Sequence, residues 1–379
     1  MKKYKIAFIG GNIKSAIGMT HKIASQMDGK FELVAGAFSR NHNTNVETAK
    51  NYGIDSSHLY GNYLEMLTQE KNNIDVIAVL VSTDMHEKIV IDCLEAGYNV
   101  ICEKSLAVSY KSGCRIVEAA RINKRFLAVT YNYTGYPMIR VLKEKISKGL
   151  FGEITSIIIE MPQEGYIRFN ADGKKPTPQS WRLKDYEIPT ISLDLGSHLH
   201  NLIAFLINEK PVSLVSTENS YGFFKGLIDD VNCIVKYSNN IDVQMWYSKS
   251  ALGNRNGLMI RIFGTKASAQ WYQMEPEILK INKNDGTCCI FDRSNDLLVG
   301  LDSRYNRFKA GHPIGFIEAF ANYYCDLYDC LQHFEKTGEY ESKYILPLEK
   351  TIEGLKMFEL AHKSAQNYTW MTFEKERRK

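Results

Sequence analysis

The sequence contains no C-x-x-C pair and no other metal-ligand spacing among its eight cysteines. Several of these cysteines lie in apolar runs, which is typical of reduced thiols in the core of a cytoplasmic protein. The first apolar run is interrupted by glycine, asparagine and lysine at 10–14, and no later run is long enough to span a bilayer. We therefore expect no metal site, no signal peptide, no membrane contact and a cytoplasmic location.

The sequence also lacks a strong net charge. Its formal charge is +4, and the basic tail at 375–379 supplies most of it. A nucleic-acid partner is therefore not expected. A chain of 379 residues that is 44% hydrophobic and 24% charged, without internal repeats, is typical of a globular protein with two domains.

The first third of the chain alternates continuous apolar segments with amphipathic helical patterns. Helices are expected from Thr44, in a capping box, to Gly53, from Asp84 to Leu94, and after Ser109. The apolar segments, which suit buried strands, fall at 6–9, 31–38, 75–82, 98–104 and 126–132. This alternation predicts a doubly wound α/β domain with a parallel sheet covered on both faces, at residues 1–130.

From about residue 151 apolar and polar residues alternate, which is typical of an antiparallel sheet with one wet face. This pattern holds at 154–161, 213–221, 232–238, 242–248 and 258–264, and helices are expected at 194–207, 315–334 and 347–366. Residues 131–379 are thus predicted to form a second α/β domain with a large, mainly antiparallel open sheet.

A glycine turn follows the first predicted strand. Gly10, Gly11 and Gly18 fit a lengthened form of the loop that lets phosphates approach a helix N-terminus, and Ser15 can add a hydroxyl donor. Asn12 stands within this loop, where a glycine would strengthen the pattern. The loop predicts a dinucleotide site, although a tight turn without a ligand explains the same residues.

The end of the second predicted strand bears on the choice of cofactor. An acidic residue there would hold a ribose 2′-hydroxyl, but the chain has Ser39 and Arg40. A hydroxyl and a guanidinium suit a 2′-phosphate, so NADP is slightly favoured over NAD. Arg40 as a solvated loop residue is the alternative.

Further motifs fall at 82–86 (STDMH), 102–105 (CEKS), 194–198 (DLGSH) and 311–313 (GHP). With the glycine loop, they resemble the Gfo/Idh/MocA family of NAD(P)-dependent sugar and cyclitol dehydrogenases over nearly the whole chain. The resemblance implies an N-terminal Rossmann domain, a homodimer or homotetramer, and a small polyol or sugar substrate. It departs from the family pattern at Ser105, where proline is usual. The cofactor contacts that it implies are Ser82, Thr83, His86, Glu103, Lys104 and Asn132.

Lys104 is the candidate acid or base at the cofactor edge. Oxidation of a secondary alcohol with a nicotinamide requires a base to take the hydroxyl proton, and reduction requires an acid. A lysine at a strand end can hydrogen-bond the reacting oxygen, and partial burial favours its neutral form. A structural lysine is the alternative, and the resemblance favours the catalytic role.

His198 and Asp194 form the second part of the predicted catalytic set. Imidazole can exchange a proton near neutral pH, and residues four apart share one face of an α-helix. Asp194 would orient His198 or bind a substrate hydroxyl. Alternatively, Asp194 is a helix N-cap and His198 a core histidine.

The remaining candidates are substrate contacts. Tyr133 follows the last predicted strand of the first domain, and Trp181 with Arg182 lies in a polar loop that suits a sugar-binding wall. His312 could reach the substrate or could fix the start of the long helix. Trp181 could equally serve only to pack its own loop.

These residues predict an NAD(P)-dependent dehydrogenase or reductase acting on CH–OH groups of a sugar, sugar derivative or inositol. Two alternatives stay open: a cofactor-binding regulatory protein without turnover, and a lyase or glycosidase that oxidises its substrate transiently. Assembly is expected because the aromatic residues of the second sheet exceed what one core can hold. These residues are Trp246, Tyr247, Trp271 and Tyr272.

Overall fold

The computed structural model describes residues 2–295, 299 and 301–373, so the basic tail at 375–379 lies outside the described residues. By internal contacts the chain divides into two compact units. Unit 1 comprises Met1–Tyr136 and Gly315–Ile352, and unit 2 comprises Pro137–Ile314 and Glu353–Lys379. The assignment of cofactor binding to residues 1–130 and of substrate binding to residues 131–379 remains a prediction.

The described strands of unit 1 form one parallel sheet in the order β2-β1-β3-β4-β5. Its strands are β1 (Tyr4–Gly10), β2 (Phe31–Ala37), β3 (Val76–Leu80), β4 (Asn99–Cys102) and β5 (Leu127–Val129). The strand order changes direction between β1 and β3, and right-handed crossovers therefore place helices on both faces. The predicted doubly wound sheet is confirmed.

The helices of the first part of unit 1 are α1 (Gly18–Gln26), α2 (His42–Tyr52), α3 (Tyr63–Gln69), α4 (His86–Glu95) and α5 (Tyr110–Ile122). Two expected caps are wrong. Asn41 caps α2 by accepting from the Thr44 amide at 3.0 Å, because the helix begins at His42 and Thr44 is already its third residue. Asp84 is exposed in a 3₁₀ turn that precedes α4, so it does not cap that helix.

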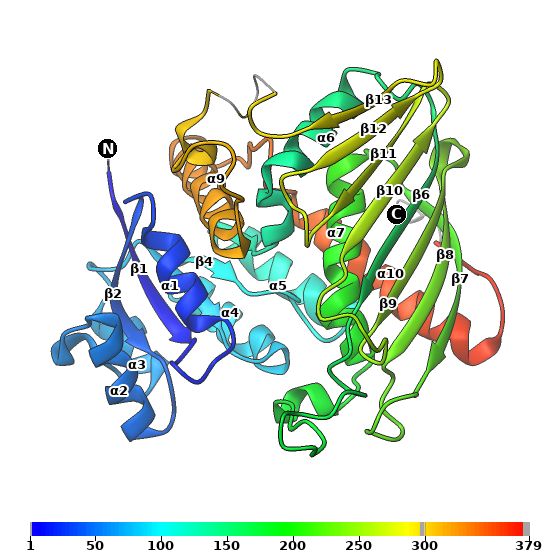
Figure 1. Ribbon diagram of the computed structural model, residues 1–379. Coiled ribbons are helices and arrows are strands. Elements are labelled where there is room, and N and C mark those ends of the chain that lie inside the picture. Colours follow the sequence, from blue (N-terminus) through cyan, green and yellow to red (C-terminus); the bar gives the residue numbers. More distant parts are fainter. Residues whose placement is uncertain (1, 296–298, 300, 374–379) are drawn as a thin grey trace. The chain divides into compact units, whose positions relative to one another are not determined.

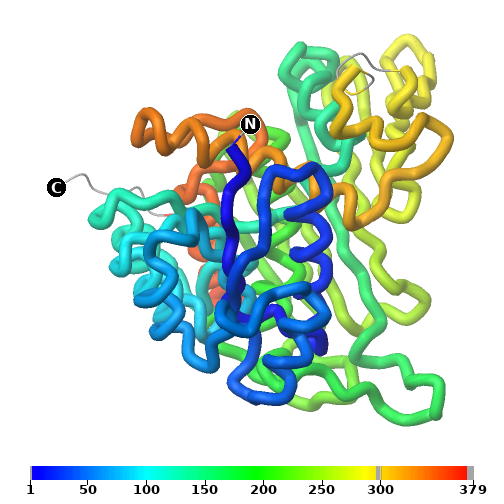
Figure 2. The backbone as a smooth tube through the Cα atoms, turned by 90° about the vertical axis from the view of Figure 1, so that its left-hand side faces the viewer, coloured from blue at the N-terminus to red at the C-terminus, as the bar shows by residue number. Residues whose placement is uncertain are grey.

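Helix α9 (Phe316–Thr337) completes unit 1 from a distant part of the sequence. Tyr328 stacks edge-on against Tyr4 and Phe31 and donates to the Lys2 carbonyl at 2.7 Å. Figure 2 shows this orange helix beside the blue N-terminal strand. The core of unit 1 therefore depends on both segments of the chain.

The described strands of unit 2 form a large sheet in the order β13-β12-β11-β10-β6-β9-β8-β7-β14. All neighbours pair antiparallel except β6 and β9, so the predicted mainly antiparallel sheet is confirmed. The strands are β6 (Ile154–Pro162), β7 (Pro211–Asn219), β8 (Asp230–Tyr237), β9 (Asp242–Ser248), β10 (Met259–Gly264), β11 (Ala267–Tyr272), β12 (Leu279–Lys283), β13 (Cys288–Phe291) and β14 (Met371–Thr372).

The two faces of this sheet differ. Helices α6 (Pro137–Ser147), α7 (Ser197–Leu206) and α10 (Leu348–Asn367) lie along one face (Figure 1), and Tyr247 and Trp271 are fully buried in the core. On the other face Trp246 and Tyr272 are half-buried, and Ile234 is 42% exposed. None of the described helices combines the length and apolarity that crossing a bilayer requires.

Candidate functional site

The register of the parallel sheet gathers the cofactor candidates of unit 1 at one edge. Gly10 pairs with Leu80, Val79 with Cys102, and Cys102 with Val129. The residues that follow these strands, including Gly11, Lys104 and Asn132, therefore leave the sheet at the same carboxyl edge. Ligands of open α/β sheets bind outside this edge, at the point where the strand order reverses.

The glycine loop has a backbone that only glycine can adopt easily. Gly10 and Gly11 have φ angles of +82° and +69°. A Cβ atom on Gly18 would lie 2.0 Å from the Gly11 carbonyl oxygen, and Tyr52 donates a 2.9 Å hydrogen bond to that same oxygen. The loop thus holds the N-terminus of α1 against the end of β1, which fits a dinucleotide pyrophosphate.

Asn12 and Ser15 shape this loop from within. The Asn12 side chain accepts from the Lys14 amide at 2.9 Å. The Ser15 hydroxyl oxygen accepts from the amides of Ile17 and Gly18, each at 3.2 Å. Donation from Ser15 to a phosphate remains a prediction.

Ser39 and Arg40 follow β2, next to the glycine loop. Asn45 fixes this turn, because its side-chain oxygen accepts from the amides of Phe38 at 2.9 Å and Ser39 at 3.1 Å. The Ser39 hydroxyl accepts from the Asn41 amide at 3.1 Å, and Arg40 is exposed. The turn is therefore held by buried Asn45 while the guanidinium reaches solvent.

The residues after β3 fall into two groups. Ser82 is half-buried, whereas Thr83 and His86 are buried. The ring nitrogens of His86 lie 2.8 Å from the Ser105 carbonyl oxygen and 3.1 Å from that of Val81. Burial lowers the pKa of His86 despite these contacts. His86 therefore ties the chain after β3 to the chain after Lys104.

Glu103 and Lys104 follow β4, and the bond between Lys104 and Ser105 is a cis peptide. Lys104 is half-buried, whereas the Glu103 carboxylate is buried. The Glu103 carboxylate accepts from the Thr130 hydroxyl and lies 3.0 Å from Nε2 of His21. Glu103 thus faces the interior of unit 1.

Asn132 and Tyr133 begin a 3₁₀ turn after β5. Asn132 is 2% exposed, and its side-chain nitrogen has no hydrogen-bond partner among the described residues. Tyr133 packs its ring 6.2 Å from Tyr136 and 6.4 Å from Phe316. The buried Asn132 donor and the glycine loop both lie at the carboxyl edge of the sheet, and together they fit a nicotinamide dinucleotide.

In unit 2 the structure brings Asp194 together with two cations. Its carboxylate forms ion pairs with Arg182 and Lys249, whose side chains are 23% and 7% exposed. Asp194 lies in a π-helical turn, Ser192–Gly196, that leads into α7, so it is not an N-cap. Asp194 was predicted to share a helix face with His198 from the spacing of an α-helix. That spacing does not apply in a π-helical turn.

Lys249 and Tyr166 belong to this cluster but were not predicted from the sequence. Lys249 follows β9, and its carbonyl accepts from the Tyr166 amide at 2.8 Å. The Lys249 ammonium lies 5.1 Å from the Tyr166 ring centre, and the Tyr166 hydroxyl donates to the Arg182 carbonyl at 2.9 Å. Burial raises the pKa of Tyr166 to about 12. The available signal was a lone lysine in the apolar stretch 243–252.

Trp181 and His198 lie near this cluster in the sequence. The Trp181 indole donates to the Gln179 side chain at 3.1 Å, and the Arg182 guanidinium lies 4.4 Å from its ring centre. Trp181 is half-buried, and His198 is 7% exposed on α7. The loop therefore places Trp181 and Arg182 side by side, and their role as a sugar-binding wall remains a prediction.

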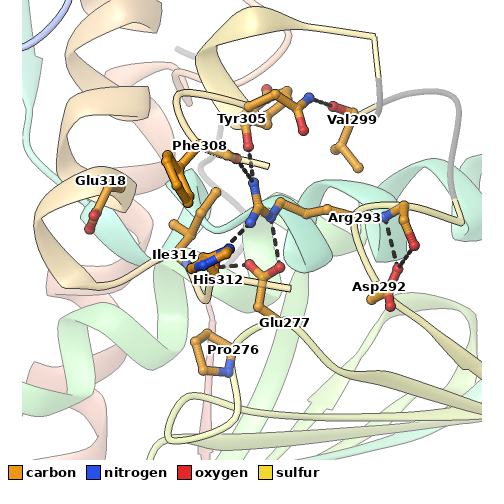
Figure 3. Close-up of polar contacts among 12 residues, drawn as sticks. Pro276, Glu277, Asp292, Arg293, Val299, Tyr305, Phe308, His312, Ile314 and Glu318 are labelled. Carbon is orange, nitrogen blue, oxygen red and sulfur yellow. Dashed lines mark hydrogen bonds and ion pairs between the residues drawn. The ribbon is translucent and has the colours of Figure 1, made fainter. Parts of the chain in front are cut away.

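His312 lies in a segment that other residues fix (Figure 3). The buried Arg293 donates to the His312 carbonyl at 2.6 Å and to Glu277 at 2.6 Å, and Glu277 accepts from the Ile314 amide at 3.2 Å. The exposed His312 ring packs 4.5 Å from Phe308. Arg293 and Glu277, rather than the imidazole, fix the chain that leads toward α9.

In residues 2–295, 299 and 301–373, no group of three or more His, Cys, Asp and Glu side chains could hold a metal ion.

Comparison with known proteins assigns both parts of the chain. Residues 4–131 match the family described as "Oxidoreductase family, NAD-binding Rossmann fold". Residues 139–270 match the "GFO/IDH/MocA C-terminal domain". The two matches together cover more than half of the chain.

Individual relatives match most of the length of this chain. "Uncharacterized oxidoreductase YfiI" of Bacillus subtilis (strain 168) is 27% identical over 98% of both chains. Levoglucosan dehydrogenase of Pseudarthrobacter phenanthrenivorans is 22% identical over 71% of this chain and 73% of its own. The structure of an inositol dehydrogenase homolog from Azotobacter vinelandii, complexed with NADH and myo-inositol, has a TM-score of 0.86 and 25% identity over 98% of both chains.

Proposed function

Since the chain belongs to the Gfo/Idh/MocA family of NAD-binding oxidoreductases, we propose that it transfers hydride between a nicotinamide cofactor and a secondary alcohol. The proposed substrate is a sugar, a sugar derivative or an inositol. The relatives named as levoglucosan dehydrogenase and inositol dehydrogenase homolog support this substrate class.

One observation carries the proposal. The glycine cradle, Lys104 and the buried amide of Asn132 follow three strands of one parallel sheet, and the strand register brings them to a single edge. An acid or base beside a dinucleotide cradle is what hydride transfer to or from an alcohol requires.

In this proposal the glycine loop holds the pyrophosphate and Asn132 donates to the nicotinamide end. The nicotinamide, when bound, supplies the hydride acceptor or donor. Lys104 hydrogen-bonds the substrate oxygen and, during oxidation, takes its proton as a free amine. During reduction the ammonium returns that proton.

Unit 2 supplies the substrate contacts in this proposal. His198 is the other candidate for the acid or base that takes or returns the hydroxyl proton. Asp194, held by Arg182 and Lys249, accepts a hydrogen bond from a substrate hydroxyl or orients His198. Trp181 and Arg182 offer an aromatic face and a donor, which suit a hydroxyl-rich ligand.

Both NAD and NADP are considered, with NADP slightly favoured. The proposal for NADP depends on Ser39 and Arg40, which replace an acidic ribose ligand after β2. The exposed guanidinium suits a charge-assisted contact with a 2′-phosphate.

A homodimer or homotetramer is proposed from the open face of the unit 2 sheet. Half-buried Trp246 and Tyr272 and exposed Ile234 lie on this face, which the helices of unit 2 do not cover in the described part of the chain. Burial of such a face against a second copy would remove apolar surface from water.

The test is the absorbance of reduced nicotinamide across a panel of polyols, sugars and inositols, with NAD and NADP assayed separately. We expect at least one substrate to reduce the cofactor stoichiometrically, and folded Lys104→Ala protein to lose this turnover. Product formation without net cofactor reduction would indicate a lyase or glycosidase instead. Cofactor binding without any product would indicate a regulatory protein.

A further inference from the structure

A continuous hydrogen-bonded chain of buried side chains crosses unit 1 and ends beside Lys104. Nδ1 of His21 lies 2.7 Å from the Tyr324 hydroxyl, and Nε2 lies 3.0 Å from the Glu103 carboxylate. His21 is 0% exposed, Tyr324 is 1% exposed and Glu103 is 8% exposed. The chain therefore links α1, α9 and the end of β4.

The chemistry of Glu103 fixes the direction of its hydrogen bond to His21. An ionised carboxylate only accepts, so Nε2 of His21 carries the hydrogen between them. Burial raises the pKa of Tyr324, so the phenol at Nδ1 keeps its proton. His21 therefore donates to Glu103, which also accepts from the Thr130 hydroxyl.

These donors keep a buried carboxylate ionised. Burial raises the pKa of Glu103, but the His21 hydrogen bond and charge, then Lys104 and Thr130, outweigh burial and lower that pKa. The attraction between Glu103 and Lys104 is mutual, so the carboxylate stabilises the ammonium form of Lys104.

The other titratable groups that interact with Glu103 are neutral near pH 7. Burial raises the pKa values of Cys102 and Tyr131 and lowers that of His86. Within this group Glu103 therefore carries the negative charge, and it is the residue next to Lys104 in the chain.

We propose that His21 is a positioning residue that keeps Glu103 a carboxylate and thereby sets the pH at which Lys104 becomes a free amine. Tyr324 holds the His21 ring in the orientation that this role needs, through its 2.7 Å contact with Nδ1. The catalytic consequence rests on the proposed function of Lys104, whereas the protonation of Lys104 does not.

The first experiment needs neither cofactor nor substrate. Acetic anhydride labels free amines, and mass spectrometry of the Lys104 peptide gives the extent of labelling at each pH, with exposed Lys14 as the internal reference. In Glu103→Gln the midpoint of the Lys104 curve should fall below the wild-type midpoint, because the removed negative charge favours the ammonium form of the neighbouring lysine.

A pair of substitutions at one position separates positioning from packing. The amide of Gln at position 21 mimics Nε2 and keeps a donor toward Glu103, whereas the amide of Asn mimics Nδ1 and keeps only the Tyr324 contact. His21→Gln should therefore retain the wild-type curve, and His21→Asn should shift it to lower pH. Glu70→Gln is the matched control, since Glu70 is a buried carboxylate beside a histidine and precedes β3, at the opposite edge of the sheet.

An unchanged midpoint in folded Glu103→Gln overturns the proposal, as does an equal shift in His21→Gln and His21→Asn. Circular dichroism establishes which variants fold. If none of these three folds, Tyr324→Phe decides, because it removes one hydroxyl: a small shift to lower pH supports the proposal and no shift overturns it.

The second readout is the pH dependence of kcat for alcohol oxidation. Since Lys104 acts there as a free amine, the rise of kcat with pH should move to lower pH in Glu103→Gln. A wild-type protein that turns over no substrate would count against the proposed function, and the labelling curves would still decide the role of His21.

Discussion

Asp194→Asn removes the anion from a buried cluster and leaves the cations of Arg182 and Lys249 facing each other. Breaking a buried ion pair by removing one partner costs about 3 to 5 kcal/mol. Because the Arg182 side chain is 23% exposed, we expect a value at the lower end, about 3 kcal/mol. The free energy of unfolding of unit 2 should fall by this amount.

The tryptophans make this measurement specific to one unit. All four tryptophans of the chain (Trp181, Trp246, Trp271 and Trp370) lie in unit 2. Urea unfolding followed by tryptophan fluorescence therefore reports unit 2, and its midpoint should fall in Asp194→Asn without a change in slope.

A double-mutant cycle tests the electrostatic reason. Lys249→Met should cost less than Asp194→Asn, since Asp194 then keeps Arg182 as its partner. The double variant should be more stable than the sum of the single effects predicts, by about 1 to 3 kcal/mol. A loss below about 1 kcal/mol in Asp194→Asn, the value typical of exposed pairs, would refute the reasoning.

Other predictions concern catalysis, cofactor choice and assembly. Folded Lys104→Ala and His198→Ala should each lower kcat by at least about a hundredfold with little change in cofactor dissociation constants, and near-normal turnover would show that these residues are structural. Arg40→Ala should weaken NADP selectively, by roughly 1.5 to 3 kcal/mol in a fluorescence titration, and equal losses for NAD and NADP would contradict the phosphate contact. Light scattering should show an oligomer that Ile234→Glu dissociates; a monomeric wild type at micromolar concentration would disprove the assembly.

Local patterns predicted the type of both sheets, but of the second sheet they predicted only strands β6 to β10 and not β11 to β14. Continuous apolar segments gave the parallel strands, and alternation gave strands such as β8, because burial on two faces or one leaves a direct mark on the sequence. Helix α6 has a strong apolar face but was not predicted, since the soft boundary near residue 130 obscured its start at Pro137.

The partners of the candidate residues were not predictable from the sequence. Lys249 lies 55 residues from Asp194, and His21 lies 82 residues from Glu103, so neither pair has a spacing that indicates contact. The π-helical turn around Asp194 also has no local signal in the sequence, and it changes the geometry on which the pairing with His198 was predicted. Tertiary packing, rather than local propensity, determines these details.

Unit 1 is built from two distant segments of the chain, and this has a consequence for its folding during translation. The Tyr324 hydroxyl that meets His21 is translated 303 residues after it, and the Tyr328 ring that packs on Tyr4 also belongs to α9. A nascent chain that has emerged only through β5 therefore lacks the helix that covers these side chains, and we expect it to expose them to chaperones until α9 leaves the ribosome. For the same reason, a cut after Tyr136 would release a fragment that lacks α9. A shortened chain that joins the two segments of unit 1 directly would retain α9.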